Sequence, residues 1–171
     1  KDKDDYFLVL SRLVPYKKVD LVVEVFNEIK LPLVVIGDGE EMSKIKKIAK
    51  ENIRILGWQE DHIVRDYLSK AQALIFPAEE DFGIVPVESQ ASGTPVIAYG
   101  KGGALETVIE GETGIFFYEQ NVESLKKAIF RFINERDNFK TENIVKNAYR
   151  FSKDRFLKEF KEFLDEILNN A

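Results

Sequence analysis

The sequence predicts an α/β protein: a doubly wound parallel sheet of about six strands, with helices on both faces and a helical C-terminal tail. Up to residue 121, apolar runs of strand length alternate with segments of helical period. The strand candidates are continuously apolar, as in Leu33–Ile36, which is typical of parallel strands covered on both faces. From Val122 onward only helical spacing remains. The expected architecture is therefore Rossmann-like.

Each expected element has its own signal in the sequence. Pro32 and Gly37 bound the second strand, and the last helix carries an apolar stripe of helical spacing. No internal repeat, low-complexity tract or Pro- and Gly-rich linker divides the chain, so we expect residues 1–171 to form one domain. The expected strands are Tyr6–Ser11, Leu33–Ile36, Ile53–Gly57, Ala73–Phe76, Pro95–Ala98 and Gly114–Phe117. The expected helices are Val19–Lys30, Glu40–Lys50, Asp61–Lys70, Ile84–Ser92, Ala104–Ile109, Val122–Glu135, Thr141–Tyr149 and Asp154–Leu168, the last with Phe156, Phe160, Phe163, Leu164 and Ile167 on its stripe.

Composition excludes several classes of function. The chain has 171 residues, 44% of them hydrophobic and 32% charged, as in an ordinary soluble globular protein. It has no Cys, which excludes disulfides, thiolate metal sites and Cys nucleophiles and suits a reducing cytoplasm. A net charge of −5 argues against a nucleic-acid partner. No apolar run approaches the roughly 18 residues of a membrane span. The chain begins Lys1-Asp2 without Met, so we expect it to be part of a longer protein.

Basic residues follow the first expected strand. Arg12 and Lys17 lie between the end of that strand and the start of a helix, in the segment 11–20. Ligands of open parallel sheets bind beyond the carboxyl ends of the strands, and a helix start adds positive partial charge. Arg grips phosphate oxygens as a fork, and Lys acts as a point charge. We therefore expect a diphosphate here; the alternative is a solvated loop with ordinary surface cations.

Two further loops at the same edge give weaker signals. The Gly37-Asp38-Gly39 segment permits a close backbone approach but is not the full G-x-G-x-x-G fingerprint, so a simple turn is the favoured interpretation. Trp58 follows the third strand, and its backbone can meet the edge of a base, whereas its side chain is expected in core or rim packing. His62 has no ligand partners in the sequence and is expected on the surface.

The fourth loop holds an acidic motif around Gly83. Glu80 is expected on the loop, and Glu88 one turn into the helix that begins at Ile84. A carboxylate accepts two hydrogen bonds from a vicinal diol, so Glu88 suits a ribose, whereas Glu80 can hold sugar hydroxyls or balance positive charge. The free amides of Phe82, Gly83 and Ile84 would add donors. The alternative, that acids only complement the helix dipole, accounts for one Glu but not for two.

Paired carboxylates also raise glycoside hydrolysis as an alternative. That chemistry needs no grip on a diphosphate. The basic loop that contains Arg12 and Lys17 therefore favours an activated, phosphate-linked sugar as the substrate.

Six segments together resemble the C-terminal, nucleotide-sugar-binding domain of glycosyltransferase family 4, the group 1 enzymes, which are retaining enzymes of two-domain GT-B architecture. The resemblance covers nearly the whole chain. Its strength lies in the order and spacing of the segments, because each one alone is weak. They are Ser11–Lys17, Val35–Gly39, Ile53–Gly57, Glu80–Glu88 with the Ala91–Val96 pattern behind it, Gly102–Glu106 and Glu110–Gly114.

The resemblance assigns roles to the site residues. Arg12, Lys17 and Glu80 are the expected catalytic residues. Arg12 and Lys17 would hold the donor diphosphate, and Glu80 would contact the donor sugar together with the backbone of Phe82 and Gly83. Glu88 would bind the ribose hydroxyls. The backbone near Trp58 would meet the base, and the turn that contains Thr94 would shape the pocket floor. Ile84, for its free amide, and Gly37, for its close backbone approach, complete the expected donor site on the residue pattern alone.

The sequence departs from the family pattern after Lys17, where Lys18 stands in place of the usual Gly, which weighs against a direct approach of that amide to a phosphate. After Glu88 it reads Ser89-Gln90-Ala91, where Ala-Met-Ala is common, which is a mild packing change.

By this resemblance the chain is a glycosyltransferase donor domain that serves retaining transfer of a hexose to an acceptor hydroxyl in polysaccharide or glycolipid biosynthesis. GDP-mannose is the first expectation for the donor and a UDP-hexose the next. No metal or other cofactor is expected. The acceptor is expected to bind through an N-terminal domain absent from this chain, and the whole enzyme to be cytoplasmic or peripheral at a membrane. The alternatives are a related GT-B enzyme, such as a sugar-nucleotide epimerase or a phosphorylase, and a non-catalytic nucleotide-binding module.

Overall fold

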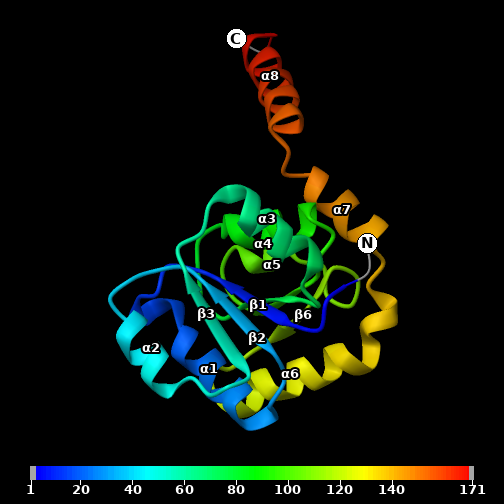
Figure 1. Cartoon of the computed structure of the whole chain (residues 1–171). Helices are drawn as coiled ribbons and strands as arrows, with labels where there is room; N and C mark the ends of the chain where they lie inside the picture. Colours follow the sequence, from blue (N-terminus) through cyan, green and yellow to red (C-terminus); the bar gives the residue numbers. More distant parts are fainter. Residues whose placement is uncertain (1–2, 170–171) are drawn as a thin grey trace.

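The described part of the chain contains one parallel sheet of six strands between two layers of helices (Figure 1). The structure, a computed structural model, describes residues 3–169. The strand order is β3-β2-β1-β4-β5-β6, and every pair is parallel. The strands are β1 (Phe7–Leu10), β2 (Leu33–Ile36), β3 (Ile53–Gly57), β4 (Leu74–Phe76), β5 (Val96–Tyr99) and β6 (Gly114–Phe117). The expected doubly wound fold and its strands are confirmed.

The helices also follow the sequence pattern. They are α1 (Val19–Ile29), α2 (Met42–Ile48), α3 (Asp61–Lys70), α4 (Ile84–Ala91), α5 (Ala104–Thr107), α6 (Val122–Glu135), α7 (Thr141–Tyr149) and α8 (Lys153–Asn169). The second helix is shorter than expected at both ends. Residues 39–41 form a turn in which the Met42 amide donates to the Gly39 carbonyl at 3.0 Å, and the backbone at Ala49 is already extended.

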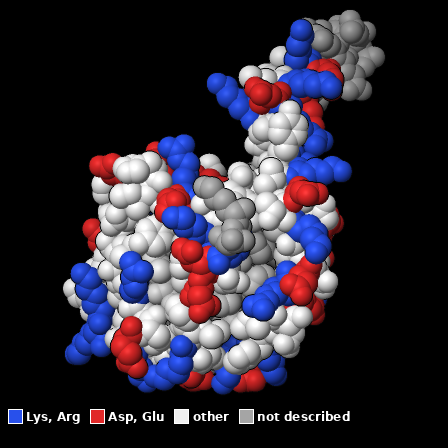
Figure 2. Space-filling view, turned by 45° about the vertical axis from the view of Figure 1, so that its right-hand side comes forward, with Lys and Arg blue, Asp and Glu red and all other residues white. Residues whose placement is uncertain are grey.

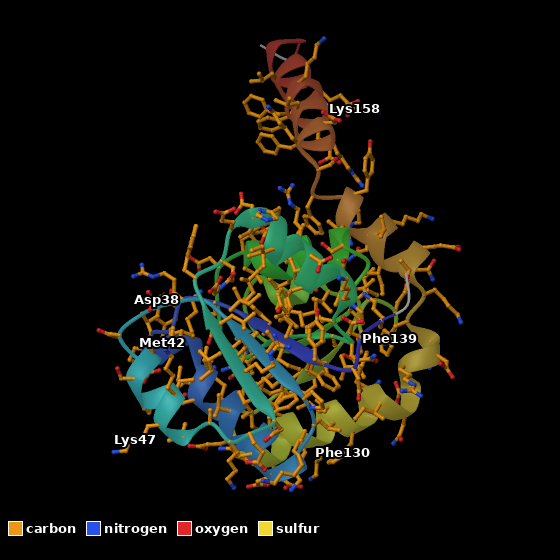
Figure 3. The ribbon with its side chains drawn as sticks, in the orientation of Figure 1. Asp38, Met42, Lys47, Phe130, Phe139 and Lys158 are labelled. Atoms are coloured by element: carbon orange, nitrogen blue, oxygen red, sulfur yellow. The ribbon has the colours of Figure 1, made fainter. Side chains whose placement is uncertain are left out.

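Alternate strand residues point into two separate cores, because successive side chains of a strand face opposite sides of the sheet. Phe7 and Val9 lie in the larger core with residues of α1 and α6. Leu8 lies in the core on the other face, beneath α3, α4 and α5 (Figure 1). Helix α6 buries Leu125, Ile129 and Phe132 against the sheet, while Phe130 points outward (Figure 3).

The C-terminal helix α8 projects away from the rest of the molecule (Figure 1). Its side chains are exposed throughout residues 153–164, and the rings of Phe156 and Phe160 stack 6.0 Å apart on its apolar stripe. The last expected member of that stripe, Ile167, lies outside the side chains that the structure describes. Both signs of charge are interspersed on α8 and on the face of the body seen in Figure 2. Within residues 3–169, no helix is long and apolar enough to cross a membrane.

The strand order creates a crevice between β1 and β4. From β1 the chain proceeds outward to β2 and β3, then returns across the sheet to β4, which pairs with β1 through Leu8 and Leu74. Loops that follow β1 and β4 therefore leave the same edge of the sheet and diverge to opposite faces. Ligands of doubly wound sheets bind at such a switch point, outside the carboxyl ends of the strands.

Candidate functional site

The loop after β1 directs one cation into the crevice and leaves another at its rim. Pro15–Lys17 form a single 3-10 turn, for which Pro15 supplies the preset φ angle. Lys18 then adopts a left-handed conformation (φ 57°), and α1 begins at Val19. This geometry leaves the Lys17 side chain only 15% exposed. Arg12, earlier in the loop, is exposed and lines an open pocket.

The loop after β4 places two carboxylates on the other side of the crevice. Gly83 has a φ of 74°, which only Gly adopts without strain, and it turns the chain into α4 at Ile84. Glu80 lies on the loop with 22% of its side chain exposed, and Glu88 lies just beyond the first turn of the helix.

An ion pair joins the two loops: the ammonium of Lys17 contacts the carboxylate of Glu80. These residues are far apart in sequence and meet because β1 and β4 are neighbours in the sheet. Lys17 also lies 5.0 Å from the centre of the Tyr16 ring, which adds a cation–π contact. The structure thus brings together a basic and an acidic residue that sequence reasoning had assigned to one site.

An open pocket of about 780 Å³ lies at the carboxyl edge of β1, β2 and β3, and neither Lys17 nor Glu80 is among its lining residues. Arg12 and Glu88 both line it, so the pocket joins the basic loop to the acidic helix. Val64 and Val85 supply apolar wall, and the exposed Trp58 lies at the rim with 72% of its surface accessible. Asp38, in the loop after β2, is labelled in Figure 3 and also lines the pocket. The full lining is Leu10, Ser11, Arg12, Ile36, Gly37, Asp38, Gly39, Trp58, Gln59, Asp61, Val64, Val85 and Glu88.

The pKa of Glu88 is raised above its ordinary value. Burial is the larger cause, because it penalises the charged form, and the nearby carboxylate of Asp61 adds repulsion. Hydroxyl donors would offset both effects, since hydrogen bonds to the carboxylate stabilise its charged form. The electrostatics of Glu88 therefore suit a ligand that carries hydroxyl groups, such as a ribose.

Gly37 and Gly39 support the Arg12 loop from the neighbouring β2–α2 loop. A Cβ atom on either Gly would lie under 3.0 Å from backbone atoms of Ser11 or Leu13, the residues on each side of Arg12. The amide of Leu13 donates to the Asp38 carbonyl at 3.0 Å. Gly37 lines the pocket, but its clearest structural role is this close backbone packing.

Phe82 and Ile84 lie away from the pocket lining. The Phe82 ring packs edge-on against Phe151 at 5.8 Å, and the Ile84 side chain is 63% exposed. Their proposed contribution was through backbone amides, and among residues 3–169 we see no hydrogen bond from the amides of residues 82–84. These amides remain candidate donors for a ligand at the start of α4.

The prediction for Thr94 is wrong. Helix α4 runs from the carboxyl edge of the sheet back to the amino edge, and Thr94 lies there, just before β5. It is fully buried, donates to the Leu68 carbonyl and accepts from the Lys3 ammonium at 2.5 Å. Thr94 therefore holds the base of the sheet together and cannot reach a donor at the opposite edge.

His62 is on the surface, as expected, with its ring 3.3 Å from Glu60. In the part of the chain that the structure describes, no group of three or more His, Cys, Asp or Glu residues is placed to hold a metal ion.

Sequence reasoning missed two polar residues of the pocket, Gln59 and Asp61. The available signal was their position directly after β3, at the same edge as the other loops. The Gln59 amide nitrogen donates to the Leu56 carbonyl at 2.9 Å, which fixes the side chain at the rim. The apolar walls of the pocket were not predicted either, because Val64 and Val85 resemble ordinary core positions of helices.

Comparison with known proteins places these features in a family context. The family model for Glycosyl transferases group 1 matches residues 1–151. An uncharacterized glycosyltransferase of Methanocaldococcus jannaschii is 33% identical over 154 residues, which are 87% of this chain and 43% of that protein. A GDP-mannose-dependent monoacylated alpha-(1-6)-phosphatidylinositol monomannoside mannosyltransferase of Corynebacterium glutamicum is 30% identical over 141 residues, 73% of this chain and 37% of that protein.

Among solved structures, Anabaena HepE in complex with UDP superposes with a TM-score of 0.76 at 22% identity, over 99% of this chain and 50% of that one. The likeness shows a shared fold. The chain spans half or less of the length of these three proteins.

Proposed function

Because this chain belongs to the group 1 glycosyl transferases and has the fold of their GT-B nucleotide-sugar-binding half, we propose that it is the donor domain of a retaining hexosyltransferase. The observation that carries the proposal is that the Lys17–Glu80 ion pair and a pocket lined by Arg12 and Glu88 lie at the same carboxyl edge of the sheet. Residues 1–171 act in this proposal as one donor-binding domain.

The proposed mechanism stabilises charge as the donor bond breaks. Negative charge builds on the departing diphosphate, and Arg12 and Lys17 supply positive charge at that point. Lys17 is held in place by Glu80 before the donor arrives, so little reorganisation is needed. The sugar becomes cation-like as it leaves, and the Glu80 carboxylate, with the backbone of Phe82 and Gly83, faces it. Glu88 accepts hydrogen bonds from the ribose hydroxyls.

GDP-mannose is the first choice of donor and a UDP-hexose the second. Relatives named as GDP-mannose-dependent mannosyltransferases support the first, and the complexes of Anabaena HepE with UDP and UDP-glucose support the second. Two cations provide the charge that a divalent metal supplies elsewhere, so the proposal needs no metal or other cofactor.

The acceptor side belongs to the whole protein. Relatives that are roughly twice as long support a second, acceptor-binding domain, with a polysaccharide or glycolipid precursor as acceptor and peripheral membrane contact for the whole enzyme. This chain alone is then expected to bind the donor weakly and to transfer nothing.

Calorimetric titration of this chain with GDP, UDP and ADP tests the proposal. At least one nucleotide should bind, and Arg12→Ala, Lys17→Ala and Glu88→Ala should each weaken it about tenfold or more, which corresponds to about 1.4 kcal/mol. Lys127→Ala and Glu123→Ala are matched controls, since these residues form an exposed pair on α6. Absence of binding to all three nucleotides, or equal losses in the control variants, would refute the proposal.

A further inference from the structure

A second glycine pair, Gly102 and Gly103, packs against the acidic loop from the loop between β5 and α5. The amide of Gly103 donates to the Glu80 carbonyl at 2.7 Å. A Cβ atom on Gly102 would lie under 3.0 Å from the Glu80 carbonyl oxygen, and one on Gly103 under 3.0 Å from backbone atoms of Asp81 and Phe82. Contacts this short with backbone atoms are not relieved by a side-chain rotation, so the loop itself would have to move.

The arrangement mirrors the one on the other side of the switch point. There Gly37 and Gly39, in the loop after β2, abut the backbone on both sides of Arg12. The Arg12 loop follows β1, and the glycine loop that packs against it follows the neighbouring strand β2. In the same way, the Glu80 loop follows β4, and its glycine loop follows the neighbouring strand β5. The absence of side chains lets the two backbones approach closely.

We infer that Gly102 and Gly103 are positioning residues for the donor sugar. Because they lack side chains, the backbone of residues 80–82 can lie against them, and this contact fixes the position of the Glu80 carboxylate and of the neighbouring amides. Gly39 does the same for the Arg12 loop, which faces the diphosphate. The inference rests on the proposed function and adds to it that Gly102 and Gly103 govern recognition of the sugar, whereas Gly37 and Gly39 govern recognition of the nucleotide.

Gly111 provides a matched control for Gly102. Both have a positive φ, 63° for Gly102 and 76° for Gly111, so replacement by Ala strains both backbones. A Cβ atom on Gly111, however, would meet nothing within 4 Å. Any effect of Gly102→Ala beyond that of Gly111→Ala therefore reports displacement of the Glu80 loop. Gly103 has no positive φ, so Gly103→Ala is a second variant that introduces the steric contact without that strain.

The first measurement compares the dissociation constants of GDP and GDP-mannose, and of UDP and UDP-glucose, for this chain and its variants. Gly102→Ala and Gly103→Ala should weaken the nucleotide sugar relative to the free nucleotide at least fivefold, whereas Gly111→Ala should leave that ratio unchanged. Gly39→Ala should weaken both ligands together. The same ratio in Gly102→Ala, Gly103→Ala and Gly111→Ala would overturn the inference.

The second measurement needs no ligand, so it separates the inference from the proposed function. Lys17→Met should lower the melting temperature, because it removes one partner of the Lys17–Glu80 pair. This shift should fall to less than half in a Gly102→Ala or Gly103→Ala background and stay the same in a Gly111→Ala background. If the shift falls in this way while the parent chain binds no nucleotide sugar, the proposed function is refuted and the positioning role stands. If the shift is equal in all backgrounds, the positioning role fails, whatever the chain binds.

Discussion

Separating Lys17 from Glu80 should destabilise the protein strongly, and replacing both should cost little more than replacing one. Their side chains are only 15% and 22% exposed, so a lone charge left at this position is poorly solvated. Removing one partner of a buried pair costs about 3–5 kcal/mol, and an exposed pair contributes about 0.2–1 kcal/mol. Because both groups retain some solvent contact, we expect about 2–3 kcal/mol for Lys17→Met and similarly for Glu80→Gln.

The double variant should lose about 3 kcal/mol, since neither neutral group then needs the other; the coupling energy is thus about 2 kcal/mol. Urea denaturation of the four proteins gives this value, provided that the slope against denaturant is constant across the cycle. The exposed pair Lys127–Glu123, at 3.6 Å, is the control, and its cycle should give under about 0.5 kcal/mol. A Lys17–Glu80 coupling as small as that of the control pair would refute the claim that the two loops hold each other in place.

Three further predictions concern the free chain. Burial raises the pKa of Glu88, so protonation of Glu88 stabilises the folded state in acid, and this stabilisation is lost as the pH rises through the folded pKa. Glu88→Gln should therefore raise the free energy of unfolding at pH 7 and should have no such effect near pH 3.5. Lys18→Gly should stabilise the protein by roughly 0.5–1 kcal/mol, because Lys18 is left-handed with a φ of 57°. Removal of α8 after Ser152 should change the melting temperature by less than about 2 °C, since residues 153–164 are exposed throughout.

Each of these has a clear contrary result. A stability gain for Glu88→Gln that is as large in acid as at neutral pH would mean that its charge is not the cause. Destabilisation by Lys18→Gly in urea titrations would show that the Lys18 side chain contributes more than its backbone strain costs. The melting temperature of the chain without α8 is measured by differential scanning calorimetry. A large drop would mean that α8 packs against the rest of the protein.

Local pattern was sufficient for most of the secondary structure. Continuously apolar runs such as Leu33–Ile36 predicted the buried parallel strands to within a residue or two, because a strand covered on both faces has no other composition available. The errors lie where turns compete with helices, as at both ends of α2. Backbone hydrogen bonds around Gly39 and Ala49 decide those ends, and residue periodicity does not report them.

The sequence predicted the location of most candidate site residues, and their roles stay predictions. Residues in loops after strands, such as Arg12, Glu80 and Trp58, could be placed at one edge because the strand ends mark that edge of a parallel sheet. Thr94 was misplaced because it follows a helix, and the chain has by then returned to the other edge. The sequence pattern predicts only that a helix starts at Asp61, and its position near Glu88 is known from the folded chain alone.

The sequence by itself determined the alternation of strands and helices, the parallel character of the sheet and the loops that carry charged groups, since each depends on residues close together in the chain. Tertiary structure decided that β1 lies beside β4, that Lys17 therefore meets Glu80, and that glycine pairs from the outer strands support both loops. Strand order depends on tertiary structure because it is set by the packing of apolar faces from distant segments of the chain. The residues of one strand do not specify which other strand lies beside it.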